Sequence, residues 1–239
     1  MSAYRMQKQC DAEGVFVVEG EKLCREALDS GFGIRVICGT EEWFATQNNA
    51  TLDLAAEVYV LTPEQLERLS NLRTPNKVWM IVERKETWDS TGDSSLTLAL
   101  DGLQDPGNMG TILRIADWYG IRRVVCGEGT VSCYNPKVVQ SSMGAIFRTE
   151  IIRCDLPVWL SSSKERGTTV YGAHLDGTNI YKTSLQKPAV LVIGNEGKGI
   201  SAEVSAMVDS RITIPNIGGT CESLNAAIAT AIICSEFYR

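Results

Sequence analysis

Apolar runs divide the chain into segments that are typical of β-strands and amphipathic helices. Three of these runs, 96–100, 189–193 and 211–214, each lead into a glycine-bearing loop that holds polar residues. After the third loop comes an apolar stretch that predicts a buried helix, with Ser223 as its expected N-cap. Strands alternate with helices throughout this part of the chain, so we expect an α/β fold with a mostly parallel sheet.

The first half of the chain repeats this alternation on a smaller scale. Short β-like runs lie at 16–20, 34–38, 57–61 and 78–83, with helical patterns at 21–30 and 40–50. The run Thr62-Pro63-Glu64-Gln65 has the composition of a capping box and predicts a further helix start. The stretch 85–95 is polar and lacks periodicity, as linkers do. We therefore expect a small α/β domain over 1–84, a linker over 85–95 and a larger domain over 96–239.

Composition limits the classes of protein that fit. The net charge of −6 argues against a protein that coats nucleic acid non-specifically, so any affinity for RNA must come from a local patch, from shape or from an oligomer. No apolar run has the length of a membrane span, and residues 1–14 do not read as a secretory signal. Cysteines in a chain of this kind point to a reducing compartment, and we expect the cytoplasm.

Several common sites are excluded by the motifs. The eight cysteines include no C-x-x-C pair, and His174 is the single histidine. The chain therefore does not fit a zinc finger, a thioredoxin or a Ser/His/Asp hydrolase. The glycines at 194–199 have the wrong order for a dinucleotide fold, and Lys198 is not followed by Ser or Thr as in a P-loop. We expect His174 to be structural and ligand binding to be independent of metal.

The three loops nevertheless have the character of a ligand site. Loops at the carboxyl ends of strands in α/β sheets are where ligands bind, and glycines there let the backbone come close to a ligand. Their sequences fit N-x-G-x-x-x-R from Asn108 to Arg114, G-N-E-G-x-G-I-S from 194 to 201, and I-P followed by E-S-L-N-A from 214 to 226. Together they resemble the three motifs of the SpoU (TrmH) family, which are RNA ribose 2′-O-methyltransferases of the SPOUT class.

The resemblance implies a fold, a cofactor and partners. It implies that the C-terminal domain contains a deep trefoil knot, which spacing and composition do not show, and that the enzyme works as a homodimer. Phe16-Val17-Val18-Glu19-Gly20 resembles the start of the ribosomal-protein-like substrate-binding domain of many SpoU enzymes. The implied reaction is methyl transfer from S-adenosylmethionine to a ribose 2′-hydroxyl of RNA, with S-adenosylhomocysteine as product. Ribosomal RNA is the first expected substrate and transfer RNA the second.

The resemblance also assigns residues to the reaction. The expected catalytic residues are Arg114, Asn108, Glu196, Ser223 and Asn225. Arg114 acts either as a base on the hydroxyl or, as we prefer, as a clamp on phosphate and developing oxyanion charge, because a guanidinium titrates too high to be a base. Asn108 is expected to orient Arg114 or the ribose, and Glu196 to position Arg114 or the partner subunit's Asn108.

The cofactor and RNA contacts complete the expected site. The expected cofactor-binding residues are Gly194, Ile214, Leu224, Gly218, Gly219, Asn195 and Gly199. The expected RNA-binding residues are Arg114, Arg148, Arg25, Arg35, Arg73 and Lys77, with Ser142 and Gly144 beside Arg148 in a further family pattern. Two alternatives stay open, a non-catalytic RNA-binding protein with the same scaffold and a small-molecule methyltransferase. We expect a chain that starts near Ser94 to fold and bind the cofactor but to methylate RNA poorly.

Overall fold

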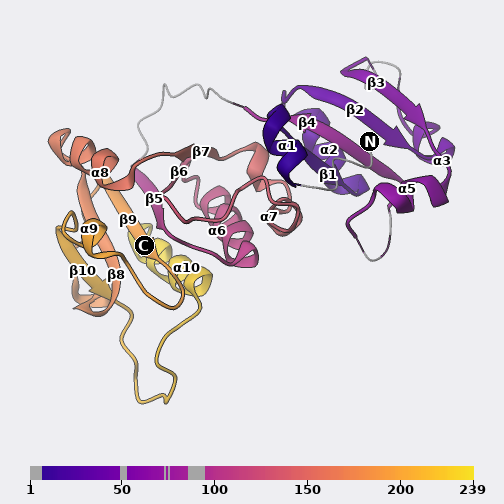
Figure 1. Ribbon diagram of the computed structural model, residues 1–239. Coiled ribbons are helices and arrows are strands. Elements are labelled where there is room, and N and C mark those ends of the chain that lie inside the picture. The colour runs from indigo at the N-terminus through magenta and orange to yellow at the C-terminus, as the bar shows by residue number, and fades with distance from the viewer. Residues whose placement is uncertain (1–6, 49–52, 73, 75, 86–94) are drawn as a thin grey trace. The chain divides into compact units, whose positions relative to one another are not determined.

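The computed structural model covers residues 1–239, and it describes all of them except 1–6, 49–52, 73, 75 and 86–94 (Figure 1). The chain forms two compact units. The first contains Met1–Trp88 and Tyr134–Phe147, and the second contains Asp89–Cys133 and Arg148–Arg239. Most of the expected linker, 86–94, lies outside the described residues. The expected domain boundaries stay a prediction, and Tyr134–Phe147 departs from them because it joins the first unit.

A four-stranded mixed sheet forms the centre of the first unit. The strand order is β1-β4-β2-β3, with β4 antiparallel to β1 and β2, and β3 parallel to β2. The elements of this unit are α1 (Gln7–Glu13), β1 (Val15–Glu19), α2 (Glu21–Asp29), β2 (Ile34–Gly39), α3 (Glu41–Phe44), β3 (Ala55–Val60), α5 (Pro63–Leu69), β4 (Val78–Glu83), α7 (Pro136–Ser142) and the 3-10 helix η2 (Ala145–Phe147). The expected capping box is confirmed, since the Thr62 hydroxyl accepts from the Gln65 amide and the Gln65 side chain accepts from the Thr62 amide.

Aromatic packing explains why Tyr134–Phe147 belongs to the first unit. The ring of Phe16, on β1, lies 4.8 Å from the Tyr134 ring and 6.1 Å from the Phe147 ring, measured between centroids. Phe32 meets Phe147 edge-on at 5.3 Å. The Gln140 side chain donates to the Glu19 carbonyl at 2.9 Å. Because Phe16 and Phe147 are both buried, this segment completes the apolar core of the unit.

The second unit is built on a six-stranded parallel sheet with the order β10-β8-β9-β5-β6-β7. Its elements are β5 (Leu96–Asp101), α6 (Pro106–Trp118), β6 (Arg123–Cys126), β7 (Glu150–Arg153), α8 (Leu156–Glu165), β8 (Thr169–Asn179), the 3-10 helix η3 (Ile180–Lys182), β9 (Ala189–Gly194), α9 (Ala202–Ser205), β10 (Ser210–Thr213) and α10 (Ala226–Phe237). The α/β class and the parallel sheet expected from the sequence are confirmed.

Helices cover this sheet. Leu156 and Leu160 of α8 and Val204 of α9 pack in one cluster with Val125 and Val190 of the strands. Helices α6 and α10 pack against each other (Figure 1). Within the described residues, no helix is long and apolar enough to cross a membrane.

Two local features differ from the sequence-based expectation. The apolar pattern at 168–173 predicts a strand that ends at Ala173, but β8 runs to Asn179 because its pairing with β10 resumes at Thr178 after a register shift that leaves 173–177 outside the strand pairing with β10. The return to pairing brings Gly177 so close to β10 that a Cβ there would lie 2.5 Å from the Ile212 carbonyl carbon. The N-cap of α10 is Asn225, so the assignment of that cap to Ser223 is wrong. Asn225 takes this place because its Oδ1 accepts from the amides of Ala227 at 2.9 Å and Ile228 at 3.2 Å.

Candidate active site

Three loops follow the strands that the sequence singled out. Loop 1 (102–105) follows β5 and leads into α6, loop 2 (195–200) follows β9, and loop 3 (214–225) joins β10 to α10. Strands β5 and β9 are neighbours, with Asp101 opposite Gly194, so loops 1 and 2 leave the same edge of the sheet side by side. Loop 3 leaves the outer strand of the sheet and returns at the start of α10, which packs on α6.

Glu196 joins loops 1 and 2. Its carboxylate accepts from the backbone amides of Gln104 at 3.1 Å and Asp105 at 3.0 Å, and from the Asn108 side chain at 3.0 Å. Partial burial by itself raises the pKa of Glu196. The hydrogen bonds from Asn108 and from the backbone amides outweigh that effect and hold the pKa below its ordinary value. Glu196 is therefore an ionised acceptor at neutral pH, with its oxygens already engaged.

Asn108 extends this link to the third loop. Its Nδ2 donates to Glu196, and its Oδ1 accepts from the Asn225 side chain at 2.8 Å. Asn225 also caps α10, so one residue ends loop 3, starts the helix and ties both to α6. Glu196, Asn108 and Asn225 form one hydrogen-bonded chain across the three loops, and all three belong to the same subunit. The Asn108 contact that Glu196 was expected to make with a partner subunit is made within the chain.

Further residues hold the loops in place, and the motifs did not single out most of them. The Asn195 side chain donates to the Gly102 carbonyl at 2.8 Å and accepts from the amides of Gly197 and Lys198. Asp101 accepts from the Ser201 amide at 2.6 Å. Asp105 caps α6 by accepting from the Asn108 amide at 2.7 Å. The Asp105-Pro106 pair is a sequence signal for such a helix start and could have identified this cap.

Buried Thr130 supports loop 1 from outside the motifs. Its hydroxyl donates to the Leu100 carbonyl at 3.0 Å and accepts from the Gly102 amide at 3.2 Å. Thr130 lies after β6, far from loop 1 in sequence, so no local pattern indicates this contact. It fixes the point at which β5 turns into loop 1.

The glycines of the expected cofactor site fall into two groups. A Cβ at Gly194 would lie 2.3 Å from the Gly199 carbonyl carbon, so glycine is required there by the fold of loop 2 itself. Gly199 and Gly218 have positive φ angles of 72° and 101° and open space where a Cβ would stand. Such positions leave the backbone accessible to a ligand. In loop 3, Leu224 is half exposed and Ile214 is partly exposed, which gives this loop apolar surface as well.

Arg114 stands apart from the hydrogen-bonded chain. It lies on α6, six residues after Asn108, which is about 9 Å along the helix axis. Its side chain is exposed, and within the described part of the chain no hydrogen bond or ion pair involves it. Asn108 thus bonds to Glu196 and Asn225 rather than to Arg114. Ser223 and Asn225 were both expected to form hydrogen bonds across the loops. Asn225 forms one with Asn108, whereas Ser223 is exposed in loop 3 and forms none within the described residues.

The expected RNA-binding residues have varied surroundings. Arg148 makes a two-pronged ion pair with Asp117 of α6, with nitrogen-to-oxygen distances of 3.0 to 3.1 Å. In the first unit, Arg35 pairs with Glu13 at 2.9 Å, and Lys77 pairs with Glu42 at 2.5 Å. Arg25 lies on α2, and Arg73 is outside the described residues. Two of these four cations of the first unit therefore already have a carboxylate partner.

The ligand chemistry of the site is that of backbone amides, carbonyls, amide side chains and one carboxylate. Within the residues described, no group of three or more His, Cys, Asp or Glu side chains is placed to hold a metal ion. A parallel α/β sheet whose strand-end loops are tied together and contain glycines with open space beside them defines an α/β protein with a candidate ligand site at the strand ends.

Comparison with known proteins then gives the family. Residues 95–235 match the model of the SpoU rRNA Methylase family, and residues 1–79 match an MRM3-like substrate binding domain. The chain belongs to the SpoU rRNA methylase family, and the resemblance drawn from its three motifs is confirmed.

Relatives and solved structures cover nearly the whole chain. A 23S rRNA (guanosine(2553)-2′-O)-methyltransferase of Bacillus subtilis is 31% identical over 228 residues, which is 95% of this chain and 90% of the relative. A Porphyromonas gingivalis structure assigned to the TrmH family of RNA methyltransferases is 41% identical, with a TM-score of 0.86 over 99% of this chain and 94% of that one. An AdoMet-bound rRNA methyltransferase of Sinorhizobium meliloti is 29% identical, with a TM-score of 0.85 over 98% and 91%.

Proposed function

We propose that this chain transfers a methyl group from S-adenosylmethionine to the 2′-hydroxyl of a ribose in structured RNA, with ribosomal RNA as the first candidate and transfer RNA as the second. The enzyme class expected from the motifs is confirmed by the family, whose members include rRNA 2′-O-methyltransferases. The observation that carries the proposal is the Glu196–Asn108–Asn225 chain, which ties the three motif loops into one frame beside the helix of Arg114.

The roles within this frame follow from the hydrogen bonds. A carboxylate whose pKa is held low is a weak base, and the oxygens of Glu196 already accept three hydrogen bonds. We therefore assign Glu196, Asn108 and Asn225 to positioning. Arg114 is an exposed cation on α6, the helix that carries Asn108, and we assign it to the phosphate and the developing negative charge on the ribose oxygen.

The loops fit the proposed cofactor. Open space where a Cβ would stand at Gly199 and Gly218 lets a ligand come close to these loops, and the half-exposed side chain of Leu224 adds the apolar surface that a nucleoside requires. S-adenosylmethionine, when bound, supplies an electrophilic methyl group on a sulfonium. The residues of this chain hold donor and acceptor in line, which by itself removes several kcal/mol of the barrier, roughly 7 or more in well-oriented systems. Binding without any metal remains a prediction.

The first unit is proposed to recognise the RNA. Its match to a substrate binding domain supports this role, as does the absence of the three motifs from its sequence. Arg25 lies on α2 and forms no ion pair within the described part of the first unit, so it is available to bind a phosphate. Arg35 and Lys77 would have to exchange their carboxylate partners for phosphates. The proposed compartment is the cytoplasm, where RNA and the methyl donor meet.

The family also leads us to propose a homodimer and a knotted C-terminal segment. Trp118 of α6 is 84% exposed and Ile228 of α10 is 52% exposed, on two helices that pack together. Exposed apolar side chains that gather in one patch mark surfaces that bind another protein, and we propose that these two side chains belong to such a patch. In the sheet, β9 lies between β8 and β5, and after the sheet is complete α10 packs on α6. Both observations support the expected trefoil knot.

One assay tests the proposed reaction against its two rivals. Purified protein is incubated with methyl-labelled S-adenosylmethionine and total RNA, and the labelled nucleotide is mapped. Label in a single ribose 2′-position supports the proposal. Binding of RNA without any transfer favours the non-catalytic scaffold, and transfer to a small molecule but not to RNA favours the small-molecule methyltransferase.

A further inference from the structure

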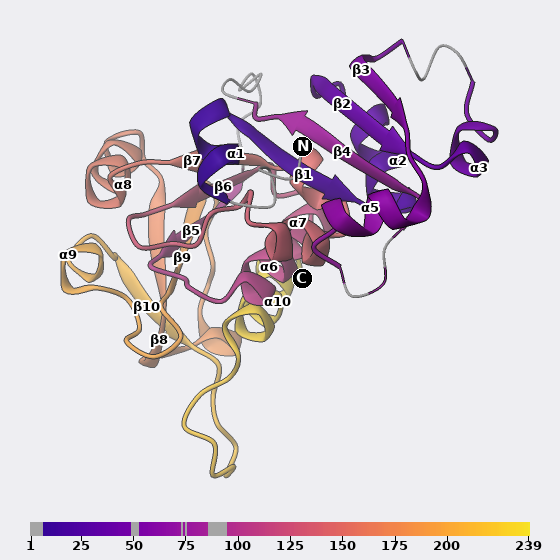
Figure 2. The same ribbon diagram turned by 45° about the vertical axis from the view of Figure 1, so that its right-hand side comes forward.

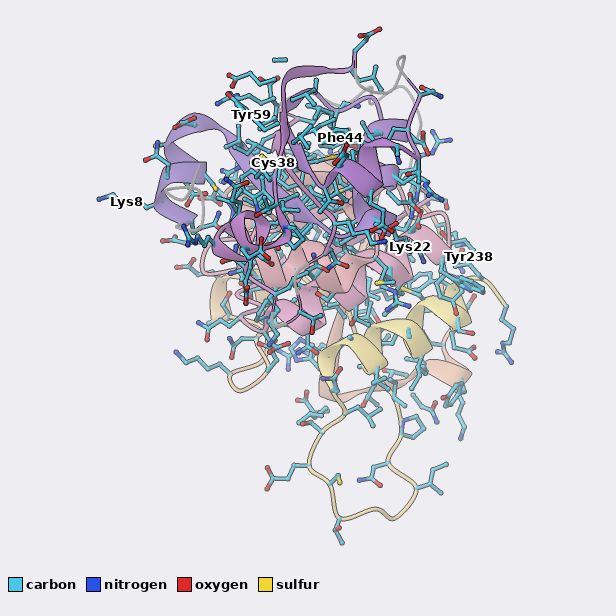
Figure 3. All side chains as sticks on the ribbon, turned by 90° about the vertical axis from the view of Figure 1, so that its right-hand side faces the viewer. Lys8, Lys22, Cys38, Phe44, Tyr59 and Tyr238 are labelled. Carbon is cyan, nitrogen blue, oxygen red and sulfur yellow. The ribbon has the colours of Figure 1, made fainter. Side chains whose placement is uncertain are left out.

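Loop 3 stands clear of the sheet and helices of its own unit. In Figures 1 and 2 the segment between β10 and α10 extends away from both, and Figure 3 shows the same loop extending away from α10. Ile217 at its tip is 95% exposed. Within the described part of the chain, every hydrogen bond recorded for residues 215–224 is internal to the loop.

All of these internal bonds come from one side chain. Asn216 Oδ1 accepts from the amides of Gly218 at 3.1 Å and Gly219 at 2.7 Å. Its Nδ2 donates to the carbonyls of Gly219 at 3.1 Å and Cys221 at 3.2 Å. An asparagine amide has two donor hydrogens and an oxygen with two lone pairs, so Asn216 uses its full capacity on the loop backbone. The motifs of the family resemblance did not single out this residue.

The glycines explain why such a side chain matters here. Two consecutive glycines, Gly218 and Gly219, give the tip more backbone freedom than any other residue pair, and Gly218 sits at a φ of 101°. A tip that is disordered before binding must be ordered when a ligand arrives, and that ordering weakens affinity. Asn216 fixes the backbone from 216 to 221 in one shape in advance.

We propose that Asn216 is a positioning residue for the methyl donor, which keeps the tip of loop 3 in one shape so that the loop docks on the cofactor as a single body. The inference rests on the proposed function, in which loop 3 forms part of the cofactor site. Asn225 anchors the C-terminal end of the loop through its hydrogen bond to Asn108. Only the residues on either side of the fixed segment 216–221 then have to move for the loop to dock on the cofactor. Asn216 itself touches backbone and takes no part in the methyl transfer.

The first measurement concerns the free protein. Hydrogen exchange of the peptide spanning 215–224 is compared in the wild type, Asn216→Ala, Asn216→Asp and the control Thr220→Ala. Thr220 is exposed in the same loop, and its side chain forms no hydrogen bond within the described residues. We expect faster exchange at Gly218 and Gly219 in Asn216→Ala, partial protection in Asn216→Asp because the carboxylate still accepts from both amides, and no change in the control. The melting temperature should stay the same in all variants.

The second measurement is calorimetric titration with S-adenosylhomocysteine. Asn216→Ala should weaken binding by about tenfold, Asn216→Asp by less, and Thr220→Ala not at all. Alkylation of Cys221, the exposed cysteine of loop 3, should be slowed by the ligand in the wild type and less so in Asn216→Ala.

The outcomes separate this inference from the proposed function. If the wild type binds no S-adenosylhomocysteine, the proposed function fails. If the wild type binds it, and Asn216→Ala shows the same affinity or the same exchange in the free protein, Asn216 is not a positioning residue.

Discussion

At the scale of single residues, the side chains of Glu196 and Asn108 hold the loops, whereas the side chain of Arg114 is exposed and free to meet a substrate. Asn108 uses both ends of its amide within the chain, and Glu196 uses both oxygens. Arg114 forms no such bond in the described part of the chain, although it lies on the same helix as Asn108. A substitution at Arg114 should therefore affect the reaction more than the fold, and substitutions in the frame should affect both.

We expect Arg114→Ala to lower turnover by about a hundredfold or more, the loss seen when a donor to a developing oxyanion is removed. The affinity for S-adenosylhomocysteine should change little, because the cofactor residues lie in loops 2 and 3. Arg114→Lys should restore little of the activity, since a point charge does not replace a planar fork. Single-turnover rates and calorimetry measure the two effects, and wild-type turnover in either variant would remove Arg114 from the mechanism.

Glu196 gives a prediction about pH. Its folded-state pKa is lowered, so its contribution to stability is present above the ordinary glutamate pKa and is lost as the pH falls through the lowered value. We expect Glu196→Gln to cost about 1 kcal/mol of unfolding free energy at pH 7, a modest figure because the side chain is exposed. Urea unfolding of both proteins should give a difference that shrinks below about pH 4. A difference that is constant down to pH 3 would contradict the assignment.

At the scale of elements, helix ends and strand ends account for most of what the sequence could predict. The Thr62–Gln65 capping box and the apolar strands before the three loops are local patterns, and the structure contains them. The N-cap of α10 was missed because Ser223 and Asn225 are both good capping residues, and the sequence does not show which of them accepts from the first amides of the helix. The end of β8 was missed because it depends on the close approach of Gly177 to β10.

Helix α6 carries a testable surface as well as the site. We expect Trp118→Glu to shift the protein from dimer to monomer, because a charge would be placed where an exposed apolar ring is proposed to meet a second copy. Val158→Glu on α8 is the matched control, since Val158 is 64% exposed but lies on a different helix. Sedimentation velocity measures both. A variant at Trp118 that stays dimeric, or a wild type that is monomeric, would contradict this interface.

At the scale of the whole molecule, the first unit is built from two separate stretches of chain. The sequence predicted a division near 85–95, which follows from composition, but it could not predict that Tyr134–Phe147 packs with the first unit. That packing depends on contacts between Phe16, Phe32 and Phe147, which are up to 131 residues apart, and no local pattern reports them. The Asn108–Asn225 bond is a similar case, because the motifs name both residues but not their pairing.

The packing of Tyr134–Phe147 with the first unit changes what a truncation should do. A chain that starts near Ser94 would lack Phe16 and Phe32, and so would expose Phe147 and the buried Val138 and Val139 of α7. We now expect that protein to aggregate or to unfold at lower temperature than the full chain, rather than to fold well and lose only RNA affinity. Light scattering and thermal unfolding test this. A soluble truncated protein that melts at the same temperature as the full chain would show that the segment needs no first unit.

The same feature limits how the protein can be rebuilt. The first unit contains two separate stretches of the chain, Met1–Trp88 and Tyr134–Phe147. A single cut or fusion point therefore cannot exchange the first unit, the proposed RNA-recognition module, for another. A chimera that gives the second unit a new N-terminal module has to transplant Tyr134–Phe147 together with that module, because the two pieces pack against each other.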